Sequence, residues 1–371
     1  MFIGTMIFCL VMKRLTLRLT YICVILLSLL SCENNNISEL RKIDLGKSVS
    51  DKANSRKAVV MDVADVEPII IDDSITVGTL RIAGVDENNM VIYDRERIMI
   101  FDRNGYLQSI VAKKGNGPQE YVNILSVYAD VDSRQLYVTD TQKRNVLRYT
   151  FEGEYIDVFH DESCGHVGGF PGGNLIMCYS PYSDSRFCFG IFDKKWNLLR
   201  ESTLRKTEID SRMLAFDGTG LFNGECFFKK CFEDTLYSVT NNVDRPVLII
   251  DKGKYKAPDE YYKTYRPQGK YILGETFSMA DEYLFLEFGF DGKMYRDVWN
   301  SEDCTLLFRS EISSEDDHPG FPVNVEGETV YCWPDYVNGD NLYCVLIYEE
   351  AKKIFPDLSE DSNPVILHLS L

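Results

Sequence analysis

Short runs of apolar and aromatic residues recur along most of this chain, and each run is closed by Asp, Asn or Gly. Segments with the apolar spacing of an amphipathic helix are scarce. Runs such as 98–101 (IMIF) and 145–149 (NVLRY) carry the β-branched and aromatic side chains that pack well on a pleated sheet. The Asn-Gly and Glu-Gly pairs between runs supply the positive φ angle that tight turns require. The pattern therefore predicts an all-β fold of short antiparallel strands.

One unit recurs along the chain, and it consists of a strand, a polar turn, a second strand and a second turn. Clear or looser copies of this unit lie at residues 90–107, 136–155, 175–199, 226–250 and 284–308. The period is roughly 45 to 55 residues, which suits the four-stranded blade of a β-propeller. Between residues 59 and 371 this period gives roughly six blades. The sequence thus predicts a six-bladed β-propeller.

A ring of blades leaves no exposed end only if the two ends of the chain share one blade. Two apolar segments are suited to that closure: residues 66–71 (VEPIII) near the start and residues 364–369 (PVILHL) at the end. We therefore expect N- and C-terminal strands to lie in the same blade and to close the ring.

The first 31 residues have the three-part layout of a signal peptide. A basic segment that contains Lys13 and Arg14 precedes an apolar stretch at residues 21–30, which is too short for a comfortable transmembrane helix. The residues ahead of Met12 are interpreted as an upstream, misassigned start. We expect residues 1–31 to be a lipoprotein signal peptide.

Residues 29–32 (LLSC) resemble the lipobox of bacterial lipoproteins, in which cleavage precedes a cysteine that receives the lipid. Cys32 is therefore the predicted lipidation site, and two or more acyl chains on it would anchor the protein stably. The alternative is an ordinary secretory signal with an incidental cysteine. Residues 32–58 are polar and predict a flexible tether, which leaves residues 59–371 for the propeller. The expected location is the bacterial cell envelope, with the lipid in the outer membrane and the domain facing the periplasm or the surface.

Charge narrows the range of partners. The 371 residues carry 40 Lys and Arg against 57 Asp and Glu, a formal net charge of −17. Loss of residues 1–31 removes three basic residues and no acidic one, which leaves 37 against 57 and a net charge of −20. Such an acidic body argues against nucleic-acid binding, which needs clustered Lys and Arg, and against direct contact with anionic lipid surfaces. The aromatic content of 12% agrees with a strand-rich fold.

Eight of the 11 cysteines remain once the signal peptide and Cys32 are set aside. An exported protein can form disulfides, and an even number of cysteines permits full pairing. The spacings are irregular, however, and several cysteines, such as Cys226 and Cys344, lie inside apolar runs. This placement favours buried thiols over a disulfide framework. The clustered Cys and His pairs of a structural zinc site are missing, so neither a metal nor another cofactor is predicted.

Several segments in combination match a known family. They are residues 101–105 (FDRNG), 114–121 (KGNGPQEY), 234–239 (DTLYSV), 245–254 (RPVLIIDKGK) and 363–367 (NPVIL). Through them the chain resembles the six-bladed β-propeller lipoproteins of gut Bacteroidetes, which are distantly similar to NHL-repeat propellers. The resemblance covers residues 59–371 and the lipobox. It implies the fold but little about activity, because propellers host many chemistries.

The glycine-rich loop at residues 115–118 is a first candidate ligand site. Together with Lys114, Asn116 and Glu120 it could hold a phosphate or a sugar, because glycine lets a ligand approach the backbone closely. Its proline removes one amide donor, however, and the Gly-Lys-Ser/Thr ending of a P-loop is missing. The favoured interpretation is a crossover between blades whose geometry demands glycine.

Three tyrosines, Tyr261, Tyr262 and Tyr265, form a second candidate site. If exposed, they suit stacking on the apolar C–H faces of sugars or contact with a protein, whereas the favoured alternative is packing over a blade edge.

His160 and His166 bring metal-binding side chains to one loop, but their spacing matches no defined metal site. No pair of carboxylates stands out, and the Gly-x-Ser-x-Gly elbow of serine hydrolases is missing. No catalytic residue and no metal ligand is predicted.

These observations favour a non-enzymatic role, in which an exported, lipid-anchored propeller binds a glycan, a peptide or a partner protein at one face of the ring. The alternative, which the resemblance to NHL-type propellers implies, is a lyase or hydrolase with its site in the central channel. The side chains around the channel distinguish the two. Converging His and carboxylate groups with perturbed pKa values indicate an enzyme, whereas scattered polar and aromatic groups indicate a binding module.

Overall fold

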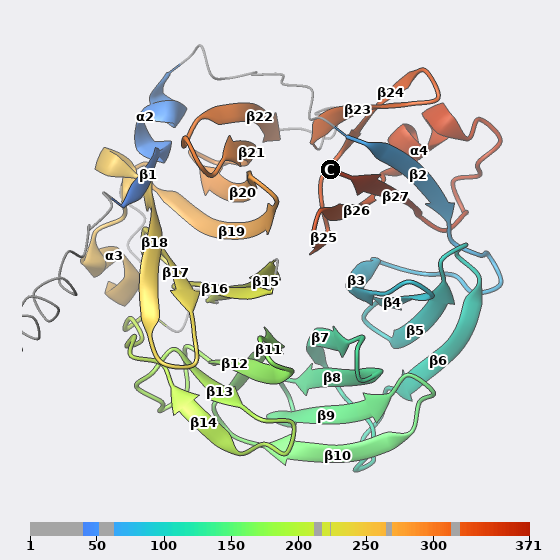
Figure 1. The fold of residues 1–371 in the computed structure, drawn as a ribbon, viewed down its shortest axis with the longest axis horizontal. Helices are drawn as coiled ribbons and strands as arrows, with labels where there is room; N and C mark the ends of the chain where they lie inside the picture. Colours follow the sequence, from blue (N-terminus) through green and yellow to red (C-terminus); the bar gives the residue numbers. More distant parts are fainter. Residues whose placement is uncertain (1–39, 52–62, 211–216, 223, 265–268, 313–319) are drawn as a thin grey trace, which may run out of the picture. The chain divides into compact units, whose positions relative to one another are not determined.

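The computed structural model describes residues 40–51, 63–210, 217–222, 224–264, 269–312 and 320–371. Residues 41–371 form one compact unit, in which six sheets of four or five strands surround a central axis (Figure 1). The first strand of each sheet lies nearest the axis, and the later strands follow outward. This arrangement is a six-bladed β-propeller, as the sequence pattern predicts.

The strands of the first five blades follow the order of the sequence. Blade 1 consists of β3 (Arg81–Val85), β4 (Asn89–Tyr93), β5 (Arg97–Asp102) and β6 (Leu107–Lys113). Blade 2 consists of β7 (Ile124–Asp130), β8 (Gln135–Asp140), β9 (Asn145–Thr150) and β10 (Tyr155–His160). Blade 3 consists of β11 (Cys164–Phe170), β12 (Asn174–Tyr179), β13 (Phe189–Phe192) and β14 (Leu198–Glu201). Blade 4 consists of β15 (Gly218–Phe222), β16 (Glu225–Lys229), β17 (Thr235–Val239) and β18 (Asp244–Asp251). Blade 5 consists of β19 (Ile272–Ala280), β20 (Tyr283–Phe290), β21 (Lys293–Asn300) and β22 (Leu306–Ile312).

The sixth blade contains both ends of the ring. It consists of β25 (Tyr336–Asn338), β26 (Asn341–Val345), β27 (Val365–Ser370) and β2 (Asp65–Ile70). Strand β2 pairs antiparallel with β27, with Val66 opposite Leu369 and Ile70 opposite Val365. The prediction that the two terminal segments share a blade is therefore confirmed.

Shorter elements lie between or within the blades. The hairpin of β23 (Phe321–Val325) and β24 (Glu328–Cys332) precedes blade 6, and helix α4 (Tyr348–Ile354) is inserted between β26 and β27. The 3₁₀-helix η3 (Gly253–Tyr255) and helix α3 (Asp259–Thr264) lie between blades 4 and 5.

Aspartates at strand ends fix many of the turns. The Oδ1 atom of Asp102 accepts hydrogen bonds from the backbone N–H groups of Asn104 and Tyr106, while Gly105 takes a φ of +87°. Carboxylates that bond to the backbone two residues onward mimic a backbone turn. The same arrangement recurs at Asp86, Asp94, Asp140 and Asp193. The five sequence copies contain the second and third strands of blades 1–5, and the aspartate device joins these two strands at Asp94 in blade 1 and Asp140 in blade 2.

The hydrophobic core is divided into layers between neighbouring blades. Blades 1 and 2, for example, share a cluster that includes Val91, Ile100, Leu136 and Leu147. Aromatic rings fill other layers: the centroids of Phe189 in blade 3 and Phe228 in blade 4 lie 4.8 Å apart. Each blade is thus stabilised by the two beside it, and closure of the ring is needed to bury every layer.

Residues 41–50 differ from the sequence prediction, which places them in a tether. Strand β1 (Arg41–Asp44) adds to blade 4 as a fifth strand, parallel to β18, and helix α2 (Leu45–Ser50) follows it. Ile43 and Leu45 are fully buried in the cluster between blades 4 and 5. The prediction of a tether is wrong for these residues, because two apolar side chains suffice to anchor a short polar segment whose backbone finds a free sheet edge.

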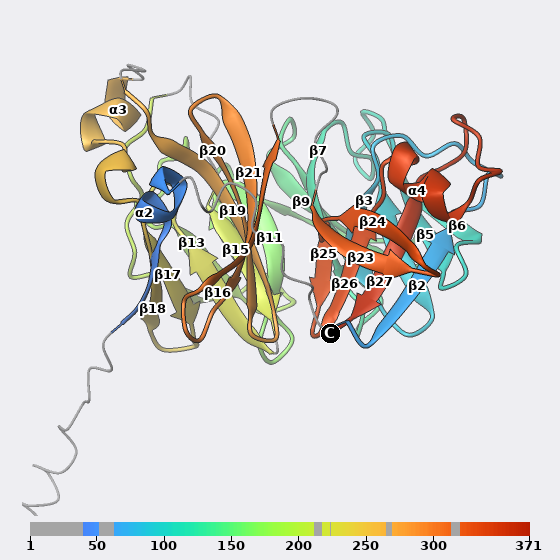
Figure 2. The ribbon, with the colours of Figure 1, turned by 90° about the horizontal axis from the view of Figure 1, so that it is seen from above.

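Two kinds of connection lie on the same side of the ring. Strands alternate in direction within a blade, so the crossover to the next blade and the turn between the second and third strands share one side. We call this side the loop face. Helices α3 and α4, which belong to such connections, both lie on it (Figure 2). The turns between first and second strands, and between third and fourth strands, lie on the opposite face.

Candidate functional site

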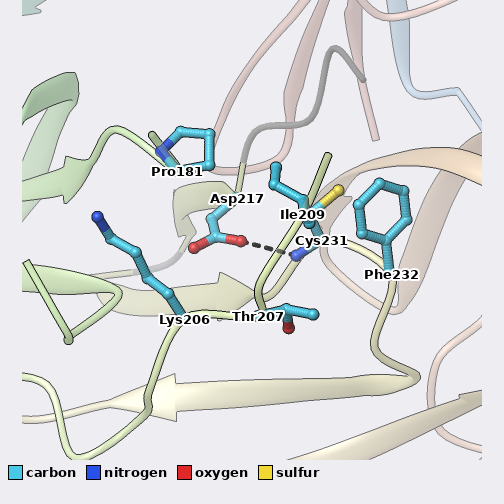
Figure 3. Close-up of a pocket in the computed structure, with 7 residues that line it drawn as sticks. All are labelled: Pro181, Lys206, Thr207, Ile209, Asp217, Cys231 and Phe232. Atoms are coloured by element: carbon cyan, nitrogen blue, oxygen red, sulfur yellow. Dashed lines mark hydrogen bonds between the residues drawn. The ribbon is translucent and has the colours of Figure 1, made fainter. Parts of the chain in front are cut away.

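A recess opens on the loop face where blades 3 and 4 meet (Figure 3). It is lined by Pro181, Lys206, Thr207, Ile209, Asp217, Cys231 and Phe232. Three connections supply these residues: the long turn after β12, the crossover from β14 to β15, and the turn between β16 and β17. The cavity has a volume of about 20 Å³, which is room for one or two groups of the size of a water molecule.

Asp217 is the acidic group of the recess and comes directly before the inner strand β15. One carboxylate oxygen, Oδ1, accepts a hydrogen bond of 2.8 Å from the backbone N–H of Cys231, as Figure 3 shows. Oδ2 has no hydrogen-bond partner among the residues that the structure describes. Burial raises the pKa of Asp217 to about 6, although this N–H group and nearby lysines act in the opposite direction. The carboxylate is therefore largely ionised at neutral pH, with one oxygen able to accept a further donor.

Lys206 lies on the other side of the recess. Its ammonium group donates to the carbonyl oxygen of Ser180, at 2.5 Å, and to the hydroxyl of Ser183. Burial lowers the pKa of Lys206, while Asp217 and other acidic neighbours partly oppose this change. The lysine thus ties the crossover to the turn after β12, and it contributes positive charge to the recess.

The thiols near the recess are poor nucleophiles. Burial raises the pKa of Cys231 to about 12, and it also raises the pKa values of Cys178 and Cys188. A thiolate rather than a thiol is the reactive form of cysteine, so these groups stay protonated and unreactive at neutral pH. The eight cysteines in the described part of the chain carry free thiols, in line with the sequence interpretation.

A buried ion network lies behind the recess and supports it. Glu275 of β19 forms ion pairs with Lys229, at 3.0 Å, and with Lys252, at 2.7 Å, and the three side chains are 2% exposed or less. Lys252 also donates to the carbonyl oxygen of Phe232, whose ring stacks on Tyr262 with centroids 4.2 Å apart. The recess wall is therefore held by contacts that join blade 4 to blade 5.

The glycine-rich loop is a crossover, and it does not reach the recess. Glu120 turns back into its own loop, where Oε2 accepts a hydrogen bond of 2.9 Å from the N–H of Gly117. Lys114 forms an ion pair with Glu96, and Asn116 is exposed. These contacts agree with the interpretation of the loop as a crossover between blades, because the Glu120 carboxylate accepts a hydrogen bond within the loop itself.

The tyrosine segment does not present a stacking surface. Tyr261 and Tyr262 are 7% and 3% exposed, and they pack with Phe232 and Ala257 beneath α3. Neither ring is therefore exposed for stacking on a ligand, and both pack as the favoured interpretation of this segment expects. Tyr265 and Cys32 lie outside the described residues.

The titratable groups near the ring axis are scattered. Burial, and secondarily the charge of Arg81, lowers the pKa of His166 on β11, whereas His160 is exposed at the end of β10. Burial raises the pKa of Tyr336 on β25 to about 12. Glu275, on the inner strand β19, is engaged by its two lysines. Within the described ranges no group of three or more His, Cys, Asp or Glu side chains is placed to hold a metal ion.

The arrangement of the six sheets defines this chain as a six-bladed β-propeller. More particularly, the chain belongs to the family described as "Domain of unknown function (DUF4934)", whose model matches residues 72–370, from just after β2 through β27. No curated protein matches the sequence.

Two solved structures share the fold. A putative exported protein from Bacteroides fragilis NCTC 9343 is similar with a TM-score of 0.64 and 16% identity, over 85% of this chain and 98% of that one. A member of the DUF4221 family from Bacteroides vulgatus ATCC 8482 is similar with a TM-score of 0.51 and 12% identity, over 86% of this chain and 98% of that one. The expected resemblance to propellers of the Bacteroidetes is thus confirmed at the level of the fold. None of the helices in the described part of the chain is both long and apolar enough to cross a membrane.

Proposed function

We propose that this propeller is an exported binding module that recognises its ligand at the loop-face recess between blades 3 and 4. The observation that carries the proposal is the carboxylate of Asp217, which burial holds at a raised pKa while Oδ2 faces the recess without a described partner. A carboxylate oxygen that faces a recess without a protein partner is free to accept a hydrogen bond from a ligand that enters there.

Two further observations support binding over catalysis. The thiols around the recess have raised pKa values, and they do not supply a thiolate. Near the ring axis the charge of Arg81 helps to lower the pKa of His166, and within the described ranges no group of three or more His, Cys, Asp or Glu side chains is placed to hold a metal ion.

The test is a binding screen with the chain from residue 33, which contains the whole described unit, against glycans, peptides and envelope proteins. Any ligand found is then measured with Asp217→Asn, for which we expect binding at least about tenfold weaker, because a hydrogen bond to a charged group is lost. The matched control is Asp132→Asn, an exposed aspartate in the turn between β7 and β8 on the opposite face. Equal loss in both variants, or no loss in Asp217→Asn, would refute this site.

We also propose that Cys32 carries a lipid that anchors the protein in the cell envelope. The lipobox-like residues 29–32 support this placement, as does the similar protein from Bacteroides fragilis, which is described as exported. Cys32→Ala is expected to move the protein from the membrane fraction to the soluble fraction, because the variant offers no thiol for acylation. Cys23→Ala, in the apolar stretch, is the control and should stay with the membranes. Retention of Cys32→Ala in the membrane fraction would contradict lipid anchoring.

A further inference from the structure

The charges around the recess restrict its ligand. Lys206, Lys229 and Lys230 all lie close enough to Asp217 to lower its pKa. A cationic ligand would meet the Lys206 ammonium group in the recess, whereas an anionic ligand would meet the Asp217 carboxylate and lose its hydration as well. The recess is therefore best matched to an uncharged group that donates hydrogen bonds.

Size points to hydroxyl groups as these donors. The cavity of about 20 Å³ admits a group of the size of water, and it is too small for a whole sugar ring or an amino-acid side chain with an aromatic ring. The Asp217 oxygen lies on one side of this space and the Thr207 side chain lines it as well (Figure 3). A ligand that fits places one or two hydroxyls inside while the remainder of it stays at the rim.

The rim supplies an apolar, aromatic surface for that remainder. Pro181, Ile209 and Phe232 form apolar walls. Tyr182, which directly follows Pro181 in the chain, is 46% exposed. Tyrosine offers a rigid, flat surface with a polar tip, which suits a ligand that is apolar on one side and polar at its edge.

We infer that the recess receives the hydroxyl edge of a neutral sugar, whose ring lies against Tyr182. A neutral pyranose has both required features, because its hydroxyls donate from the edge and its C–H groups form an apolar face. This assignment rests on the proposed function, since it names the ligand class of the same site.

The test is titration by saturation-transfer NMR and calorimetry with the methyl glycosides of glucose, galactose and mannose, and with glucosamine and glucuronic acid as charged counterparts. At least one neutral glycoside is expected to bind, and the charged sugars at least about tenfold more weakly. Asp217→Asn and Tyr182→Ala should each weaken the neutral ligand by about tenfold or more. Tyr106→Ala, which removes a 60% exposed tyrosine from the turn between β5 and β6 on the opposite face, should change nothing.

The Asp217→Asn variant is chosen so that a loss of binding does not arise from misfolding. Asparagine keeps an acceptor for the N–H of Cys231 and removes a charge that burial disfavours, so Asp217→Asn should melt no lower than the parent protein. If peptides bind at the recess and neutral sugars do not, the sugar assignment falls while the proposed binding site stands. If glucosamine or glucuronic acid binds more tightly than the neutral glycosides, the charge argument is overturned. If sugars bind equally to Asp217→Asn, both the assignment and the proposed site are overturned.

Discussion

Removal of residues 364–371 should unfold the whole ring in one cooperative transition. These residues form β27, which lies between β26 and the N-terminal strand β2. Val365, Ile366, Leu367 and Leu369 are fully buried on the two faces of this strand. Burial of each such side chain contributes about 1.5–3 kcal/mol, so their sum is comparable to the entire stability of a typical domain, about 5–15 kcal/mol.

Calorimetry and circular dichroism of the truncated chain would show the effect as loss of the native transition. A synthetic peptide of residues 363–371, added in excess, should restore part of it, because β27 pairs through its own backbone on both sides. Leu371→Ala, which alters only the residue after the strand, is the control and should cost about 1 kcal/mol or less. If blades 1–5 of the truncated chain melted at the parent temperature, closure by β27 would not be what holds the ring together.

Glu275→Gln is expected to lower the free energy of unfolding by about 3–5 kcal/mol, because it removes the carboxylate that pairs with both buried lysines and leaves Lys252 only its longer pair with Asp234, at 3.5 Å. Burial alone would raise the pKa of Glu275, but the two lysines outweigh it and hold the pKa below its ordinary value of 4.5. A carboxyl with a lowered pKa in the folded state stabilises the protein above its unfolded-state pKa. The wild-type advantage should therefore be complete at neutral pH and shrink as the pH falls below about 4.5.

Urea unfolding of the variant at pH 7 and pH 4 measures this difference. Asp291→Asn is the matched control, because Asp291 also pairs with a lysine, Lys270, but both partners are exposed, at 45% and 61%. Exposed pairs contribute about 1 kcal/mol or less, so this variant should resemble the wild type. A Glu275→Gln protein as stable as Asp291→Asn would mean that the buried lysines find other partners or lose their charge.

The blades could be predicted from the sequence because their second and third strands are apolar and are joined by polar turns. The sequence repeat does not include blade 6, because helix α4 separates its second and third strands. Only the apolar segments at the two ends of the chain predicted this blade. The strand β1 gave little signal, since Ile43 is its single apolar residue. Its place depends on the free edge of β18, some 200 residues later, which no local pattern encodes.

The recess was harder to predict. Asp217 is one of 57 acidic residues, and only the turns of two blades bring it beside Lys206 and Cys231. A usable signal was present in the segment CFFKKCF, residues 226–232, where two lysines interrupt an apolar and aromatic run. Charges inside a strand-like run indicate buried ion pairs, and Lys229 is such a residue.

The docking of residues 41–50 also sets how force reaches the ring. With a lipid on Cys32 as proposed, only nine peptide steps separate the anchor from β1, a maximum span of about 30 Å, against about 95 Å for a tether that ended at residue 58. Tension from the membrane would then load the backbone ladder between β1 and β18, together with the contacts of Arg41 with Ser301 and of Ser48 with Arg309. The closing strand β2 follows this attachment along the chain, so its pairing with β27, which closes the ring, is shielded from the tension.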